Sequence, residues 1–152
     1  MTLKQQFGDV AMKSRMWIVS LASLLLYCGP VWADAPVCAT AGGEPVPLFE
    51  PLNKMTLEAK FDDLSAALSA QFGGLAPDAL DGIKKVFPTA FASCSTLAVR
   101  EDPDGLVQAI VLFEGTGHLL FAYWVGGPRA SGLSALSFDF NTDFSKILER
   151  LR

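Results

Sequence analysis

The sequence predicts an α+β fold made of an N-terminal helical hairpin, a four-stranded antiparallel meander sheet and a C-terminal helix. Apolar residues recur with helical spacing between residues 53 and 88, short apolar runs separated by turns follow up to residue 140, and helical spacing returns after residue 141. The strands are joined by only three to seven residues, so neighbours should pair antiparallel. Helices packed on one sheet face would bury a single core.

The first 33 residues predict a secretory signal peptide that is removed from the fold. Basic residues precede an apolar run over residues 16–28, Gly29-Pro30 interrupts the chain, and the small residue Ala33 suits the position before a cleavage site. We expect a mature N-terminus at Asp34 or Pro36 and a periplasmic or extracellular protein. The basic residues are Lys4, Lys13 and Arg15.

Two alternatives to a cleaved signal peptide remain at this stage. A retained membrane anchor is disfavoured because the apolar run is shorter than the about 20 residues that a spanning helix needs. Lipoprotein processing at Cys28 is disfavoured because Tyr27, a bulky residue, precedes it.

Removal of residues 1–33 leaves 9 basic and 15 acidic residues, a net charge of −6. Such a surface repels phosphate groups, so nucleic acid is not an expected partner. The mature chain begins with an extended arm over residues 34–52, because four prolines and a Gly-Gly pair exclude a regular helix there. The single α+β domain is predicted to span residues 53–152.

Two helices are predicted to form the hairpin. The first begins with Asn53 or Thr56 as N-cap and ends at Gly73-Gly74. The second begins at Pro77 and ends before Pro88. One apolar stripe marks the first helix and comprises Leu57, Phe61, Leu64, Leu68 and Phe72.

Four strands follow, over residues 94–100, 106–114, 118–125 and 133–140. The turns between them span residues 101–105, 115–117 and 126–132, and the last is predicted to be a wide Gly-rich loop. A C-terminal helix capped by Asn141 or Thr142 completes the domain. Its apolar face comprises Phe144, Ile147, Leu148 and Leu151.

The two middle strands are apolar on both faces, although an antiparallel sheet with one wet face should alternate. Something must therefore cover part of the second face. The N-terminal arm, the last helix and a second subunit are the three alternatives.

The mature chain retains two cysteines, Cys38 and Cys94, because Cys28 lies in the signal peptide. An even number of cysteines in an oxidising compartment predicts a disulfide between them. A nucleophilic Cys94 is the alternative, and His118, the one histidine, would have to serve as its base.

Tyr123, Trp124 and Arg129 are the candidate ligand or interface residues. Tyr123 and Trp124 are adjacent in a strand and face opposite sides, so one lies away from the main core. Arg129 is the one cation in the predicted wide loop and could meet an anion. No residue pattern predicts a catalytic, metal or cofactor site: His118 has no neighbouring ligands, and Asp62-Asp63 diverge on a helix.

The sequence therefore favours a small, exported, non-enzymatic binding or interaction domain. Its partner would be a second copy or another exported protein, bound through the sheet face. The alternative is a small hydrolase or isomerase that uses a carboxylate in an apolar pocket, which a buried Asp or Glu beneath the sheet would indicate.

Overall fold

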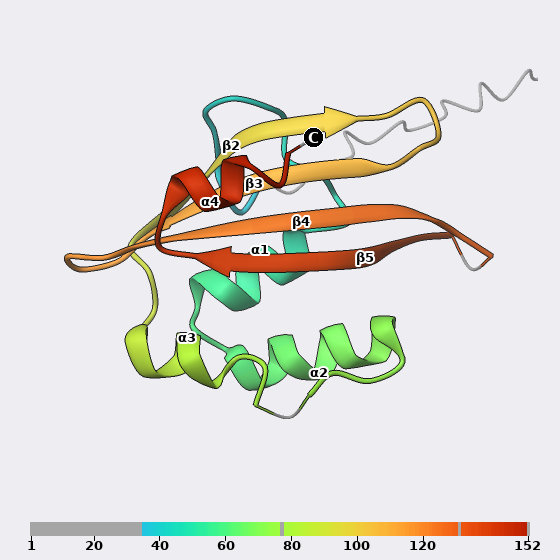
Figure 1. Cartoon of the computed structure of the whole chain (residues 1–152). Helices are drawn as coiled ribbons and strands as arrows, with labels where there is room; N and C mark the ends of the chain where they lie inside the picture. Colours follow the sequence, from blue (N-terminus) through green and yellow to red (C-terminus); the bar gives the residue numbers. More distant parts are fainter. Residues whose placement is uncertain (1–34, 77, 131, 152) are drawn as a thin grey trace, which may run out of the picture. The chain divides into compact units, whose positions relative to one another are not determined.

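The computed structural model describes residues 35–76, 78–130 and 132–151. The chain divides into two units, Met1–Ala33 and Asp34–Arg152. The described part of the second unit has the predicted α+β class, with a five-stranded mixed sheet and four helices (Figure 1). The predicted signal peptide lies outside the described residues, and so does Pro77, the predicted start of the second helix.

The antiparallel meander is confirmed, with four strands in chain order. They are β2 (Ser93–Glu101), β3 (Val107–Glu114), β4 (Leu119–Arg129) and β5 (Gly132–Asn141). The extended arm adds a fifth strand that the sequence did not predict. This strand, β1 (Ala39–Thr40), pairs parallel with β2, so the sheet is mixed and has the order β1-β2-β3-β4-β5.

The prediction of a wide loop over residues 126–132 is wrong, because β4 and β5 continue through it. Its glycines allow close packing instead of a wide turn. A Cβ atom on Gly126 would lie 2.4 Å from Leu48 Cδ2, and one on Gly127 would lie 2.8 Å from Leu136 Cδ1. The arm and a neighbouring strand therefore approach β4 closely at these glycines, where a larger residue would have to displace a leucine side chain.

The single long helix predicted after residue 53 is wrong, because two helices occupy this region. They are α1 (Glu50–Leu57) and α2 (Phe61–Phe72). Ala59 has a left-handed φ of 53°, and the Lys60 amide donates to the Met55 carbonyl. This is the Schellman ending that usually contains glycine, so no residue in the sequence signals the break.

Asn53 and Thr56 lie inside α1 and are buried, so neither is a helix cap. The third helix, α3 (Asp81–Val86), begins later than the predicted second helix, with Leu80 as its N-cap, and ends before Pro88 as predicted. The last helix, α4 (Phe144–Leu148), is capped by Asp143 and not by Asn141 or Thr142, because the Ser145 amide donates to Asp143 Oδ1 over 3.0 Å.

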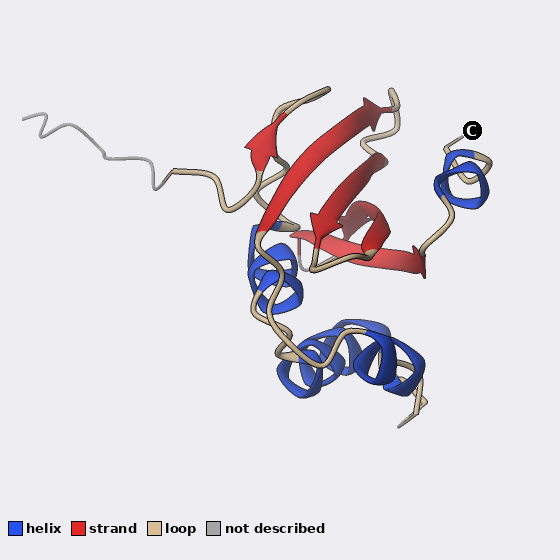
Figure 2. Cartoon of the chain, turned by 90° about the vertical axis from the view of Figure 1, so that its left-hand side faces the viewer, coloured by secondary structure: helices blue, strands red, loops and turns tan. Residues whose placement is uncertain are grey.

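Apolar clusters cover both faces of the sheet. The larger one joins α1, α2 and the segment around α3 to the first face, where Trp124, Phe113 and Leu64 are buried. The smaller one lies on the second face, where Ile147 of α4 packs against Ile110, Phe121 and Tyr123. Figure 2 shows α4 on the opposite side of the sheet from the other helices. The last helix therefore covers part of the second apolar face.

Candidate functional site

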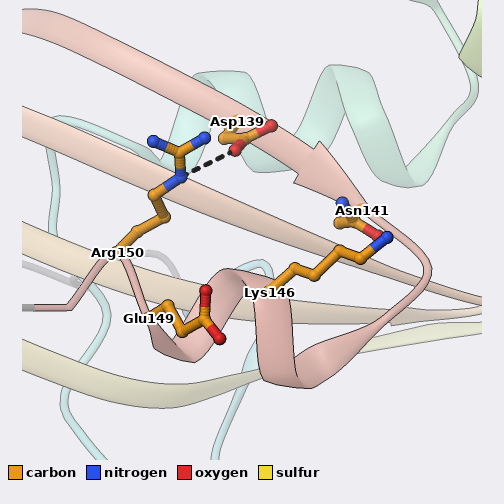
Figure 3. Close-up of a pocket in the computed structure, with 5 residues that line it drawn as sticks. All are labelled: Asp139, Asn141, Lys146, Glu149 and Arg150. Carbon is orange, nitrogen blue, oxygen red and sulfur yellow. Dashed lines mark ion pairs between the residues drawn. The ribbon is translucent and has the colours of Figure 1, made fainter.

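A polar cleft of about 660 Å³ lies on the second face between β5 and α4 (Figure 3). Alternate residues of a strand share a face, so Asp139 and Asn141 project toward the cleft together. Lys146 of α4 and Arg150, which follows the end of this helix, face them from the other side of the cleft. The lining residues are Asp139, Asn141, Lys146, Glu149 and Arg150.

The cleft combines both signs of charge. Arg150 Nε lies 3.3 Å from Asp139 Oδ2, and this ion pair joins the C-terminal segment to β5. The Arg150 side chain is 63% exposed and that of Asp139 35%. Because water screens such a pair, its contribution to stability is small, and its charges remain accessible to a partner.

Tyr123 forms the inner wall of a smaller adjoining cavity of about 310 Å³, which shares Asp139 and Arg150 with the cleft. Its register partner across β4 and β5 is Asp139. The Tyr123 hydroxyl lies 2.7 Å from Gln108 Oε1 and 3.0 Å from the Arg150 carbonyl oxygen. It can donate its single hydrogen to either acceptor, so it connects the sheet to the C-terminal segment.

This network continues to the turn between β2 and β3. The Gln108 amide donates to Asp102 Oδ2 over 3.2 Å, and Arg100 Nε donates to Asp102 Oδ1 over 2.9 Å. Gln108 is 4% exposed, and buried polar groups of this kind need such partners. The network therefore positions Tyr123 beneath the last residues of the chain.

Burial raises the pKa of Tyr123 above its usual 10.0; Asp102 adds to this increase, and Arg150 and Arg100 oppose it. The folded state therefore favours the protonated phenol. This preference contributes to the free energy of unfolding below pH 10.0, and the contribution is lost as the pH rises through the pKa of the folded state. Tyr123 is the only tyrosine of the predicted mature chain, residues 34–152, because Tyr27 lies in the predicted signal peptide.

We therefore expect phenolate absorbance of the folded mature protein to develop at a higher pH than in denaturant. An alkaline spectrophotometric titration in each solvent measures the two midpoints. Equal midpoints would contradict the buried position of the hydroxyl.

An exposed apolar strip lies on the same face of the sheet as the cleft. Phe144 and Leu148 lie one turn apart on α4 and are 39% and 50% exposed, although both belong to the predicted apolar face of this helix. Phe144 packs on Phe121 of β4 with ring centroids 5.1 Å apart. Leu119, 44% exposed, lies on the same strand face as Phe121. We call Leu119, Phe144, Leu148 and the cleft residues together the α4 surface.

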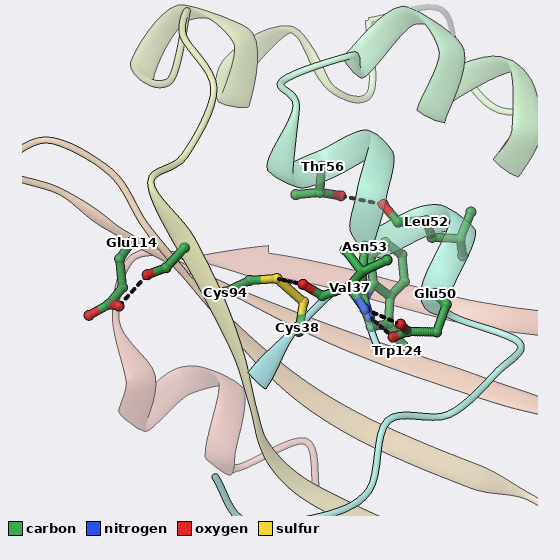
Figure 4. Close-up of a disulfide and its surroundings, with 10 residues drawn as sticks. Val37, Cys38, Glu50, Leu52, Asn53, Thr56, Cys94, Glu114 and Trp124 are labelled. Atoms are coloured by element: carbon green, nitrogen blue, oxygen red, sulfur yellow. Dashed lines mark hydrogen bonds between the residues drawn. A yellow bond between two sulfur atoms is a disulfide. The ribbon is translucent and has the colours of Figure 1, made fainter. Parts of the chain in front are cut away.

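The structure separates the three candidate residues predicted from the sequence. Tyr123 lines the smaller cavity, whereas Trp124 is fully buried in the main core and its Nε1 donates to Asn53 Oδ1 over 2.9 Å (Figure 4). Arg129 donates to the Gln71 carbonyl over 3.2 Å and so ties the end of α2 to β4. Of the three, only Tyr123 belongs to the candidate site.

The predicted disulfide is confirmed: Cys38 and Cys94 are bonded, with their Cα atoms 4.7 Å apart (Figure 4). The Val37 amide donates to Glu50 Oε2 over 2.6 Å next to this bond. The arm is therefore held to β2 and to α1, and Cys94 is not a free thiol nucleophile.

Other polar residues considered from the sequence lie apart from the cleft. His118 is exposed at the turn before β4, and Asp62 pairs with Lys84 at 2.5 Å across α2 and α3. Within the described ranges, no group of three His, Cys, Asp or Glu could hold a metal ion. The buried polar residues are Asn53, Thr56, Thr96 and Gln108, so no buried carboxylate supports the enzyme alternative in this part of the chain.

Sequence reasoning missed all five residues that line the cleft. One signal was present: Ser137, Asp139 and Asn141 alternate on the last strand, and Lys146 and Arg150 follow with a spacing of four. Their meeting depends on the direction in which the chain turns after Asn141, which local spacing does not encode.

Fold and site together define a small α+β domain with a disulfide-anchored arm and a mixed-charge cleft beneath a short C-terminal helix. No protein-family model, curated protein or solved structure matches the chain. Among the residues that the structure describes, every helix is too short or too polar to cross a bilayer.

Proposed function

We propose that this protein is a small exported binding domain without enzymatic activity, and that it binds another exported protein through the α4 surface. The observation that carries this proposal is the composition of that surface. Exposed Leu119, Phe144 and Leu148 lie on the same side of the sheet as the charged groups of the cleft. An apolar centre with a polar rim is the usual composition of a protein interface.

The disulfide supports the exported location. Structural disulfides persist in oxidising compartments and are rare in reducing ones. The Cys38–Cys94 bond is compatible with export, and the signal peptide predicted over residues 1–33 supplies the route.

The partners of the cleft residues favour binding over catalysis. Asp139 is paired with Arg150, and burial raises the pKa of the Tyr123 phenol further above neutral pH. A general base needs a free acceptor, and an activated nucleophile needs a base within hydrogen-bond reach. Charges held in pairs at an open surface instead suit recognition of complementary charges.

Site-specific photo-crosslinking in the native cells tests this proposal. A photoreactive residue at position 144 or 148 should form an adduct with an exported protein, and one at Val86 should not. Val86 is the matched control because it is 52% exposed on α3, on the other side of the sheet.

A charge reversal, Lys146→Glu, should reduce the adducts at position 144, since rim charges determine association rates. The mass of the same protein should correspond to an N-terminus at Asp34 or Pro36. Equal labelling from positions 144 and 86 would contradict the proposed interface, and an intact N-terminus would contradict export by cleavage.

A further inference from the structure

The two edges of the sheet differ in their protection against pairing with another strand. The β1 edge has two residues and leads into Gly42-Gly43 and Pro45, so it offers little backbone. The β5 edge has ten residues, and within the described sheet β5 pairs with β4 alone. Proteins usually protect a long edge with Lys, Pro, a bulge or a covering element.

Most of this protection is missing from the second half of β5. The strand contains no Lys, Arg or Pro, and its one charged residue, Asp139, is paired with Arg150. A register shift beside Gly126 and a hydrogen bond from the Ala135 amide to Gln71 Oε1 protect only its first half. Residues 137–141 pair with β4 in regular register.

Two aromatic side chains on this half are also incompletely covered. Phe138 and Phe140 contact Trp124, with ring centroids 6.2 and 5.3 Å away, yet both remain partly exposed. The aromatic row of the core therefore reaches the sheet edge, where another strand would bury it further.

We propose that the second half of β5 pairs antiparallel with the same half of β5 in a second copy across a twofold axis, over residues 137–139 if Phe138 lies at the centre and over residues 139–141 if Phe140 does. The two five-stranded sheets then form one continuous sheet. A twofold interface requires a strand compatible with itself, and β5 meets this requirement. In a register centred on Phe138, Asp139 lies opposite the partner's Ser137; in one centred on Phe140, it lies opposite the partner's Asn141.

Both registers place an aromatic pair at the centre and keep the two Asp139 carboxylates from lying directly opposite each other. Aromatic cross-strand pairs stabilise a sheet, and like charges directly opposite destabilise it. Two copies with a net charge of −6 each repel at long range. The dimer should therefore become tighter as salt screens this repulsion.

Sedimentation of the purified mature protein, residues 34–152, tests the proposal in the absence of any other partner. We expect a concentration-dependent dimer whose dissociation constant falls with added salt. Ser137→Glu places two carboxylates opposite each other in the first register, and Asn141→Glu does so in the second. One of these substitutions should weaken the dimer about fivefold, whereas the matched Ser137→Gln and Asn141→Gln variants should not.

Hydrogen exchange gives the second measurement, and amides within residues 137–141 should gain protection as protein concentration rises. A monomer at all concentrations overturns the proposal. A second result also overturns the proposal: Phe144→Glu dissociates the dimer, whereas neither Ser137→Glu nor Asn141→Glu weakens it more than the matching Gln variant. That result would place self-association on the α4 surface. Crosslinks from position 144 to another protein address the proposed function separately, so the two proposals can fail independently.

Discussion

Replacing Trp124 with alanine should lower the free energy of unfolding by about 3–5 kcal/mol. The indole is fully buried between α1 and the sheet, and it contacts the rings of Phe49, Phe138 and Phe140. Its removal leaves a cavity that these neighbours cannot fill, and it leaves the buried Asn53 without its indole donor. Urea denaturation of the mature protein, followed by far-ultraviolet circular dichroism, measures this loss.

Trp124→Phe is the matched control, because it keeps an aromatic ring but removes the donor to Asn53. The loss should then be about 1–3 kcal/mol, the usual cost of leaving a buried polar group unsatisfied. If the alanine variant were no less stable than the phenylalanine variant, packing of the indole would not be what stabilises this part of the core.

Loss of the Cys38–Cys94 disulfide should have a similarly large effect. The bond joins residues separated by 56 positions, and closing a loop of that length reduces the entropy of the unfolded chain by an amount worth about 4 kcal/mol. A Cys38→Ala, Cys94→Ala double variant should therefore unfold at a much lower urea concentration. Trp124 fluorescence reports this transition in a protein that begins at Asp34, since Trp17 and Trp32 precede this predicted mature N-terminus.

The wild-type protein under reducing conditions provides the control and should lose about as much stability as the double variant. The double variant should also show faster hydrogen exchange at residues 39–42, because the disulfide anchors β1 and the Ala41 and Gly42 amides donate to the Thr96 carbonyl. A change of under about 1 kcal/mol in both experiments would show that the hydrogen bond from Val37 to Glu50 suffices to hold the arm.

The strands and the disulfide follow from local features of the sequence. The turn at residues 102–105 contains Pro103 and ends in Gly105, whose φ is 77°, and the turn before β4 contains Gly117, whose φ is 79°. Residues that favour turns separate apolar runs of strand length, so the meander could be predicted from spacing and turn chemistry.

Gly126, Gly127 and Ala59 share one property: each departs from the role that its residue type usually has. Gly126 and Gly127 suggested a loop, but they accommodate Leu48 and Leu136 within paired strands. Ala59 suggested a continuing helix, but it adopts a left-handed conformation. The Phe91 amide then donates to the Leu57 carbonyl near the helix end, over 2.8 Å. In both cases the packing of the folded chain, and not the residue type, decides the local structure.

The candidate site shows the same division between local and tertiary information. The sequence by itself determined the fold class, the strand order along the chain, the cysteine pairing and the need to cover a doubly apolar sheet. These features follow from periodicity, turn chemistry and cysteine count, which are local or compositional properties. Only the tertiary structure decided that Trp124 faces the main core and Tyr123 the second face of the sheet. It also decided that α4 crosses the second face, which brings Lys146 and Arg150 beside Asp139. The physical reason is that packing of distant segments determines these arrangements, whereas the spacing of residues along one segment does not encode which other segment will cover it.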